Sequence, residues 1–415
     1  MTAAVLCTGT ELTRGELFNS NATYLAEALT ALGFEVGALD AVDDDAARIV
    51  RALERLAKEH DVLVCTGGLG PTTDDLTSEC VARVLGVPLD RDEASLEAIR
   101  RRVERVGRTL TASNAKQADF PRGASILPNP NGTAPGFCVT LGRATAFFLP
   151  GVPLEMKAMF AASVVPAIQP LVTDRSHQTL IRTFGLPESE VNDRLAGLDV
   201  AHGVTIGYRA RLPEIEVKLL ARAPTADAAR ARAETAAAEV RTRLGEDVVY
   251  GEGDTSLPEV VCRLFEARSL TLALAESCTG GLVAELVTGV PGASRSFLGG
   301  VVAYSNGAKT QLLGVDPALI ERHGVVSAEV ALAMAEGARR RFGSDLALAL
   351  TGIAGPDGGT PEKPVGLVHW AAASEAGVVA KHAVFSGNRE QIRRRSAYAA
   401  LALARRVVLR RAVQP

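Results

Sequence analysis

The stretch "DAARIVRALERLAKEHDVLVCTGG", from Asp45 to Gly68, joins an amphipathic helical pattern to a short apolar run that ends in two glycines. Upstream, "AAVLCTG" at 3–9 and "FEVGALDAV" at 34–42 have the composition of buried strands, and "NATYLAEALTALG" at 21–33 has an apolar helical face. Strands and helices in strict alternation predict right-handed βαβ units, and hence a parallel sheet with helices on both faces.

The segment 176–251 has a different order of elements. Its apolar and amphipathic runs predict a strand, a helix, two strands, a long helix and a last strand. This β-α-β-β-α-β order is that of a small split βαβ sandwich. After it the alternating α/β pattern resumes, and a chain of 415 residues is long enough for several domains. We therefore expect three domains, at residues 1–172, 173–251 and 252–415.

The composition indicates a globular protein, with 47% apolar and 22% charged residues and a net charge of −3. That charge gives no general attraction to nucleic acid or to an anionic membrane. The six cysteines lack CxxC spacing, and several lie in apolar runs, which favours buried free thiols over metal ligands. No targeting segment or membrane-spanning run is evident, so a cytoplasmic protein is expected.

A glycine-rich loop, "VCTGGLGPTTDDLT" at 64–77, follows a predicted strand and precedes a predicted helix. This is where an open α/β sheet binds its ligand. Backbone amides of Gly67, Gly68 and Gly70 can approach an anion there, and the Thr72 hydroxyl adds a donor. The loop thus predicts a phosphate cradle, although it matches neither the Walker loop nor the dinucleotide fingerprint.

Acidic residues accompany this loop. Asp74 and Asp75 would repel a bound phosphate, so a divalent cation such as Mg²⁺ is the expected bridge. The alternative is that one of the two caps the following helix. In the acidic run 43–45 we expect mostly helix capping, with Asp44 facing the site. Two further loops, 129–136 and 147–156, are candidates for its walls, although turn chemistry alone also explains their composition.

A second candidate site follows the strand-like run that ends in "AESCTGG", 275–281. Ser277 ends this run, and Thr279, Gly280 and Gly281 open a helix whose amides could face an oxyanion. Successive side chains of a strand point to opposite faces, so only one of Ser277 and Cys278 can face a pocket. We expect Cys278 to be packed in the core. The histidines lie outside the glycine-rich segments, which favours structural roles for them.

The candidate base for this serine is a lysine. "VVAYSNGAK", 301–309, supplies Tyr304 and Lys309 just after another apolar run. Burial shifts a lysine toward its neutral form, which can accept the proton of a serine. The residues alone leave open the alternative that Lys309 is a solvent-exposed lysine at the start of a helix.

Six motifs together resemble the CinA (competence/damage-inducible protein) family over essentially the whole chain. In order, they are "TGGLGPTTDDLT", "NPNGTAPGF", "LPGVPLEM", "AESCTGG", "YSNGAK" and "TGIAGPDGG". The resemblance implies a molybdopterin-binding-like three-layer α/β domain, a KH-type α+β domain and a C-terminal three-layer α/β deamidase domain. The middle segment lacks the GxxG loop that clamps nucleic acid, so we expect a spacer or dimerisation element, a homodimer and no nucleic-acid partner.

For the N-terminal domain, the resemblance implies metal-dependent hydrolysis of ADP-ribose to AMP and ribose 5-phosphate. Asp44 and Asp75 would hold the metal, and the glycine loop with Thr72 would hold the diphosphate.

For the C-terminal domain, the resemblance implies deamidation of nicotinamide mononucleotide (NMN) without a cofactor. Ser277 would be the nucleophile, Lys309 its base and Tyr304 a positioning or proton-relay residue. The oxyanion would be held by Thr279, Gly280 and Gly281, and the ribose and phosphate by Thr351, Gly352 and Arg389. For Arg389, an ordinary first-turn helix residue is the alternative. The competing hypothesis for the whole chain is an interaction protein of DNA uptake or repair with vestigial sites, against which its acidic balance argues.

Overall fold

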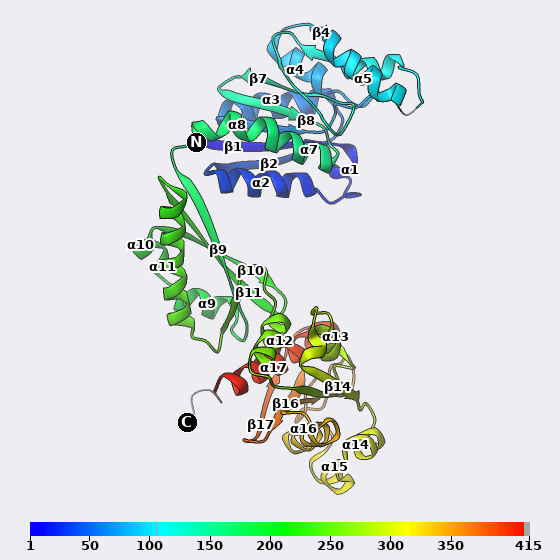
Figure 1. Cartoon of the computed structure of the whole chain (residues 1–415), viewed down its shortest axis with the longest axis vertical. Helices are drawn as coiled ribbons and strands as arrows, with labels where there is room; N and C mark the ends of the chain where they lie inside the picture. The colour runs from blue at the N-terminus through cyan, green and yellow to red at the C-terminus, as the bar shows by residue number, and fades with distance from the viewer. Residues whose placement is uncertain (106, 411–415) are drawn as a thin grey trace. The chain divides into compact units, whose positions relative to one another are not determined.

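The computed structural model describes residues 1–105 and 107–410, which form two compact units (Figure 1). The first unit comprises residues 1–177 with the short segment 222–230, and the second comprises the other described residues. None of the described helices combines the length and the apolar character that crossing a membrane requires.

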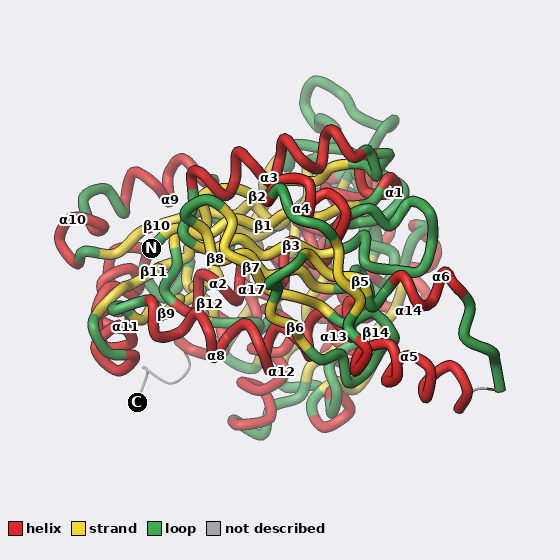
Figure 2. The backbone as a smooth tube through the Cα atoms, turned by 90° about the horizontal axis from the view of Figure 1, so that it is seen from above, coloured by secondary structure: helices red, strands yellow, loops and turns green. Residues whose placement is uncertain are grey.

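The first unit is built on a six-stranded sheet in the order β2-β1-β3-β8-β7-β6, and Figure 2 shows its central strands side by side. The first four strands of this order are parallel, and β7 and β6 are antiparallel to their neighbours. The strands are β1 (Thr2–Thr8), β2 (Glu35–Val42), β3 (Val62–Thr66), β6 (Ser125–Leu127), β7 (Gly136–Leu141) and β8 (Ala144–Leu149).

Helices cover both faces of this sheet, as the alternating pattern predicts. Ala4 and Leu6 of β1 pack with α3, whereas Ala3, Val5 and Cys7 pack with α2 on the opposite face. The helical elements are α1 (Thr10–Thr13), α2 (Ser20–Leu32), α3 (Ala46–Glu59), α4 (Thr77–Leu85), α7 (Pro153–Met159), the π-helical turn η1 (Phe160–Val164), α8 (Val165–Ile168) and η2 (Gln169–Leu171). A side layer holds β4 (Leu89–Arg91), α5 (Glu93–Arg105), α6 (Ala112–Lys116) and β5 (Asp119–Pro121).

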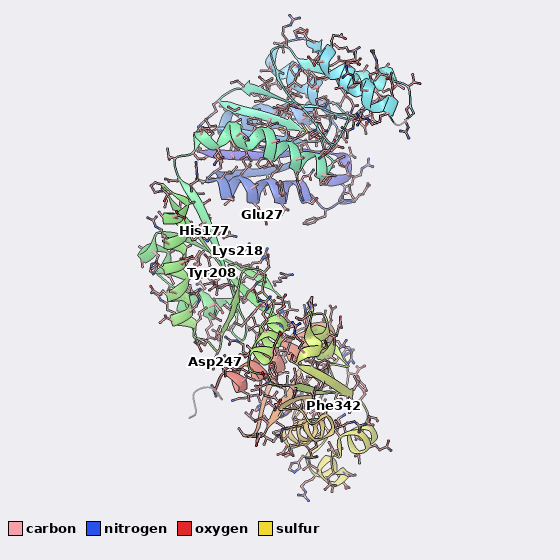
Figure 3. All side chains as sticks on the ribbon, viewed as in Figure 1. Glu27, His177, Tyr208, Lys218, Asp247 and Phe342 are labelled. Atoms are coloured by element: carbon pink, nitrogen blue, oxygen red, sulfur yellow. The ribbon has the colours of Figure 1, made fainter. Side chains whose placement is uncertain are left out.

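The second unit contains two sheets. The first has the order β10-β11-β9-β12, with antiparallel β10–β11 and β9–β12 pairs; Tyr208 and Lys218 of the β10–β11 hairpin are labelled in Figure 3. Its elements follow the predicted β-α-β-β-α-β order with one added short helix, α10. They are β9 (Arg175–Thr183), α9 (Glu188–Arg194), α10 (Leu198–His202), β10 (Val204–Arg211), β11 (Glu214–Ala223), α11 (Ala226–Leu244) and β12 (Val249–Glu252).

The other sheet has the order β14-β13-β15-β16-β17, in which β13, β14 and β15 are parallel and β16 and β17 are antiparallel. Its strands are β13 (Leu272–Glu276), β14 (Phe297–Val302), β15 (Leu346–Gly352), β16 (Leu367–Ser374) and β17 (Gly377–Val384). The helical elements are α12 (Leu257–Ala267), α13 (Leu282–Thr288), η3 (Ala293–Arg295), α14 (Asn306–Leu313), α15 (Pro317–His323), α16 (Ala328–Phe342) and α17 (Arg389–Arg410).

Strict leucine–alanine alternation decides how this sheet packs. Leu272 and Leu274 face α12, α13 and α17, whereas Ala273 and Ala275 face α16. The small alanine face lets α16 lie close to the sheet. At Gly299 of β14, an added Cβ would lie 2.8 Å from the ring of Phe342, the last residue of α16 (Figure 3), so this close approach requires glycine.

Both α/β sheets reverse their strand order at the first strand. β1 lies between β2 and β3, and β13 lies between β14 and β15, the next strands along the chain on either side. Ligands of open α/β sheets bind beyond the carboxyl ends of the strands at this reversal. The mixed α/β fold class predicted from the sequence is confirmed, and it directs attention to the loops after β1, β3, β13 and β14.

Candidate active site

Ser277 lies just beyond the carboxyl end of β13. Its backbone N–H donates to the carbonyl of Leu350 at 3.0 Å, so the serine continues the pairing of β13 with β15 by one residue. The residue is buried, at 8% exposure. The strand therefore holds the serine backbone in a fixed place at the reversal point of the sheet.

Lys309 lies in the first half of α14 and is fully buried, so the solvent-exposed alternative is wrong. Its Nζ lies 3.0 Å from Ser277 Oγ, 2.9 Å from the Ala303 carbonyl oxygen and 3.1 Å from the Tyr304 carbonyl oxygen. Burial lowers the pKa of Lys309 below 10.5. A neutral amine would donate its two hydrogens to the two carbonyls and direct its lone pair at the serine hydroxyl.

Tyr304 and Arg389 lie on the solvent side of this pair. One guanidinium nitrogen of Arg389 donates to the Tyr304 hydroxyl at 3.0 Å, and the other donates to the Gly355 carbonyl at 2.7 Å. Tyr304 is 60% exposed, and it reaches Lys309 only through its backbone carbonyl. The arginine thus links the end of β14, the start of α17 and the loop after β15.

In the turn after Ser277, the backbone amides that are available to an oxyanion differ from the predicted ones. The Gly280 N–H donates to the Ser277 carbonyl at 3.0 Å, and the Gly281 N–H donates to the Glu276 carboxylate at 3.0 Å. Neither glycine amide is free for an oxyanion, and the positive φ angles of 59° and 95° are what require glycine here. Within the described residues, the amides of Cys278 and Thr279 have no hydrogen-bond acceptor in another residue, so the candidate donors move to these two positions.

Thr351 and Gly352 serve the scaffold of this site, in contrast to the predicted substrate contact. The Thr351 hydroxyl is buried and donates to the Val325 carbonyl at 2.8 Å. Gly352 packs so closely on β16 that an added Cβ would lie 2.7 Å from the Val368 side chain. Both residues therefore hold the end of β15 against neighbouring segments of the fold.

Cys278 packs in the core, as predicted. It forms an apolar cluster with Ala354, Val368 and Ile392. Burial raises the pKa of its thiol to about 12, which keeps the sulfur in its weakly nucleophilic protonated form.

The N-terminal crevice lies at the matching edge of the other sheet, where the glycine loop follows β3. Within the described residues, the amides of Gly68, Leu69 and Gly70 have no acceptor and are available to an anion. The Gly67 amide instead donates to the Leu149 carbonyl at 3.0 Å. The Thr72 hydroxyl donates to Asp75. Of the donors predicted for the cradle, the amides of Gly68 and Gly70 are therefore available, whereas the Gly67 amide and the Thr72 hydroxyl are engaged within the protein.

The carboxylates of Asp44 and Asp75 line this crevice. Oδ2 of Asp44 accepts from the Thr10 amide and hydroxyl at 2.9 and 2.8 Å, and Oδ2 of Asp75 accepts from the Thr72 amide at 2.8 Å. Of the other two acids of the run 43–45, Asp45 caps α3 as expected, whereas Asp43 forms an ion pair with Arg48 in place of a helix cap. Neither Asp74 nor Asp75 caps α4, which begins after Leu76 without a side-chain cap.

A divalent cation fits these residues only with help from a ligand. The described residues contain no cluster of three or more His, Cys, Asp or Glu side chains that could hold a metal. Two aspartates, each with one oxygen engaged, match the way Mg²⁺ binds through one or two carboxylates plus substrate phosphates and water.

Sequence reasoning missed some residues of both sites. The buried oxygens Thr8 Oγ1 and Gln117 Oε1 line the N-terminal crevice without a hydrogen-bond partner among the described residues. At the other site, Arg393 of α17 donates to the Thr279 carbonyl at 3.2 and 2.6 Å. Thr8 was accessible to sequence reasoning, because it ends an apolar strand at the edge where ligands bind. Gln117 and Arg393 reach their sites only through tertiary packing.

Comparisons with known proteins agree with this architecture. Family models match in order along the chain: a probable molybdopterin binding domain at 4–170, a damage-inducible protein CinA KH domain at 178–251 and a CinA C-terminal domain at 254–408. A CinA-like protein of Anaeromyxobacter dehalogenans is 46% identical over 412 residues, covering 98% of this chain and 99% of its own. A CinA-like protein of Geobacter metallireducens is also 46% identical over 412 residues, covering 99% and 100%.

Among solved structures, the competence/damage inducible protein CihA of Agrobacterium tumefaciens is 39% identical, with a TM-score of 0.36. The match covers 36% of this chain and 93% of that one.

Proposed function

This chain belongs to the CinA family, and we propose that its C-terminal site hydrolyses the carboxamide of NMN to nicotinic acid mononucleotide and ammonia. One observation carries this proposal: a buried lysine, which has no carboxylate partner among the described residues, lies 3.0 Å from a serine hydroxyl at the reversal point of the sheet. Such a pair supplies a nucleophile and its base for acyl transfer.

The first half of the reaction transfers the acyl group to the enzyme. Ser277 Oγ attacks the carboxamide carbon while its proton passes to the neutral Nζ of Lys309. The oxyanion that forms can accept from the amides of Cys278 and Thr279. The lysine then gives its proton to the leaving nitrogen, which departs as ammonia and leaves an ester on Ser277.

The second half reverses these roles. Water attacks the ester carbon, Lys309 takes a proton from the water, and the same proton returns to Ser277 Oγ as the carboxylic acid leaves.

Arg389 is suited to the phosphate, because its guanidinium is held by two hydrogen bonds at the open side of the site and keeps further N–H donors.

The direct test is ammonia release from NMN by the full chain. We expect release by the wild-type protein and none by Ser277→Ala, with Ser305→Ala as a control; Ser305 caps α14 in the motif that supplies Lys309, and its hydroxyl does not reach Ser277. Equal activity of the wild type and Ser277→Ala would reject the nucleophile. If the wild-type protein releases no ammonia, the NMN assignment fails and the hypothesis of an interaction protein gains weight.

For the N-terminal crevice, we propose hydrolysis of the diphosphate bond of ADP-ribose. The three free amides of residues 68–70 suit the diphosphate, and Asp44 and Asp75 would hold a divalent cation against its oxygens. When bound, such a cation neutralises phosphate charge and activates water.

A chelator should stop ADP-ribose cleavage and leave ammonia release from NMN unchanged. Asp75→Asn should lower cleavage in the same selective way, with Asp90→Asn as a control, because Asp90 pairs with Arg122 outside the residues that line the crevice. Cleavage that survives both the chelator and Asp75→Asn would reject the metal. A homodimer and the lack of nucleic-acid binding stay predictions of the sequence.

A further inference from the structure

Glu276 is a buried carboxylate that the proposed reaction does not use. It is the last residue of β13, directly before Ser277, and only 1% of it is exposed. Oε2 accepts from the amides of Gly281 and Val283 at 3.0 and 3.1 Å, and Oε1 accepts from the amide of Ala284 at 2.8 Å. A buried carboxylate is costly unless such donors surround it.

These three amides belong to the start of α13, which the chain reaches through the turn after Ser277. In other folds, free amides at such a helix start face an anionic ligand. Here the strand before the serine supplies the anion itself. The same side chain therefore ties the end of β13 to the first turn of α13 and closes the turn 277–281 on both sides.

A second contact fixes the middle of this turn. Arg393 donates two hydrogen bonds to the Thr279 carbonyl, so the peptide unit after Thr279 cannot rotate freely. Glu276 engages the helix amides and Arg393 engages this carbonyl. Two backbone donors of the turn then have no acceptor in another described residue, the amides of Cys278 and Thr279.

We propose that Glu276 is a positioning residue, which holds Ser277 Oγ against Lys309 Nζ and leaves the amides of Cys278 and Thr279 to receive the oxyanion. This inference rests on the proposed acyl-transfer function of the site, and it adds a residue that touches neither the substrate nor the reacting atoms.

Two substitutions separate positioning from packing. Glu276→Gln keeps the volume of the side chain but replaces one acceptor oxygen by an NH₂ group, which would face an amide N–H of α13. Glu276→Asp is shorter by one methylene but keeps two acceptor oxygens. If the acceptor oxygens matter, the Asp variant is the more active; if only packing matters, the Gln variant is.

The experiment follows two reactions on the full-length protein. The first is NMN deamidation, for which kcat and KM are measured. The second is sulfonylation of Ser277 by a sulfonyl fluoride, followed by mass spectrometry, in which Ser277 Oγ bonds to sulfur, fluoride leaves and Lys309 takes the proton. The control is Glu285→Gln, the same substitution on an exposed residue of α13. Thermal unfolding checks that each variant is folded.

For Glu276→Gln we expect kcat to fall by about 10²-fold with little change in KM, because a misplaced nucleophile loses this order of rate. Sulfonylation should slow in parallel, Glu276→Asp should recover part of both rates, and Glu285→Gln should match the wild type. Wild-type rates in Glu276→Gln, or a Gln variant faster than the Asp variant, would overturn the proposal. If the wild type is sulfonylated but does not deamidate NMN, sulfonylation alone decides the role of Glu276, and only the substrate assignment fails.

Discussion

Lys309 Nζ lies 3.0 Å from Ser277 Oγ, although 32 positions of sequence separate the two residues. The parallel pairing of β13 with β14 brings them together, because both strands end at the same edge of the sheet. The two carbonyls that accept from Lys309 belong to the segment just after β14. The base is thus fixed by backbone atoms, with no carboxylate within hydrogen-bonding distance of Nζ among the described residues.

Loss of this base should strongly lower the proposed deamidase activity. We expect Lys309→Met to lower kcat by about 10³-fold, within the range of general-base contributions. The matched control is Lys363→Met, because Lys363 Nζ also donates to two backbone carbonyls, those of His323 and Val326, but to no serine. A steady-state assay of ammonia release checks both variants. Near wild-type activity of Lys309→Met would rule out the serine–lysine pair.

The lowered pKa of Lys309 predicts a specific pH dependence. The base is active when neutral, so kcat/KM should rise with pH through the pKa of the folded state, and this rise should lie below 10.5. A profile whose rise is centred at or above pH 10.5 would contradict the lowered pKa of Lys309.

The same shift affects stability. The folded state binds the lysine proton less tightly than the unfolded state. The contribution of Lys309 to the free energy of unfolding therefore falls as pH drops from 10.5 to the pKa of the folded state, and it is constant below that pKa. The thermal midpoint of Lys309→Met should therefore rise, relative to the wild type, as pH falls through this window. A difference between the two midpoints that does not change with pH would contradict the shift.

Sequence reasoning predicted the strands that precede both candidate sites and the order of the domains, because these depend on local periodicity and on the edge where parallel strands end. It did not foresee that Glu276 occupies the amides of α13, because a glutamate after an apolar run indicates only where a strand ends. Thr351 was misjudged for a related reason: its hydroxyl bonds to a carbonyl 26 positions away, a contact that only the folded chain creates.

The buried thiol next to the nucleophile should be chemically silent. With a pKa of about 12, Cys278 should resist alkylation by iodoacetamide at pH 8 in the folded protein and react once the protein is unfolded. Cys278→Ala should keep deamidase activity and lose about 1 kcal/mol of stability from the cluster with Val368 and Ile392. Peptide mapping of the alkylated cysteines checks the first expectation. Rapid labelling of Cys278 in the folded chain would contradict its burial.

Arg389 should act on the phosphate of the substrate. Arg389→Lys cannot keep both the hydrogen bond to the Gly355 carbonyl and that to the Tyr304 hydroxyl. We expect its KM for NMN to rise about 10-fold, or about 1.4 kcal/mol, with a smaller change in kcat. Nicotinamide riboside, which lacks the phosphate, is the control substrate and should show no such rise. An equal loss on both substrates would assign Arg389 to the scaffold.

Gly68 offers a test of the N-terminal crevice that leaves the other site untouched. Its φ is 66°, and an added Cβ would lie 2.2 Å from Thr77 Oγ1, so Gly68→Ala must displace the loop whose free amides form the cradle. Gly86 has nearly the same φ, 67°, but no atom within 4 Å of the added Cβ. Gly86→Ala therefore carries the backbone strain alone, about 1 kcal/mol.

We expect Gly68→Ala to lose ADP-ribose cleavage, Gly86→Ala to keep it, and both to deamidate NMN at wild-type rates. Equal loss of cleavage in the two variants would mean that general strain, and not the cradle, governs the activity.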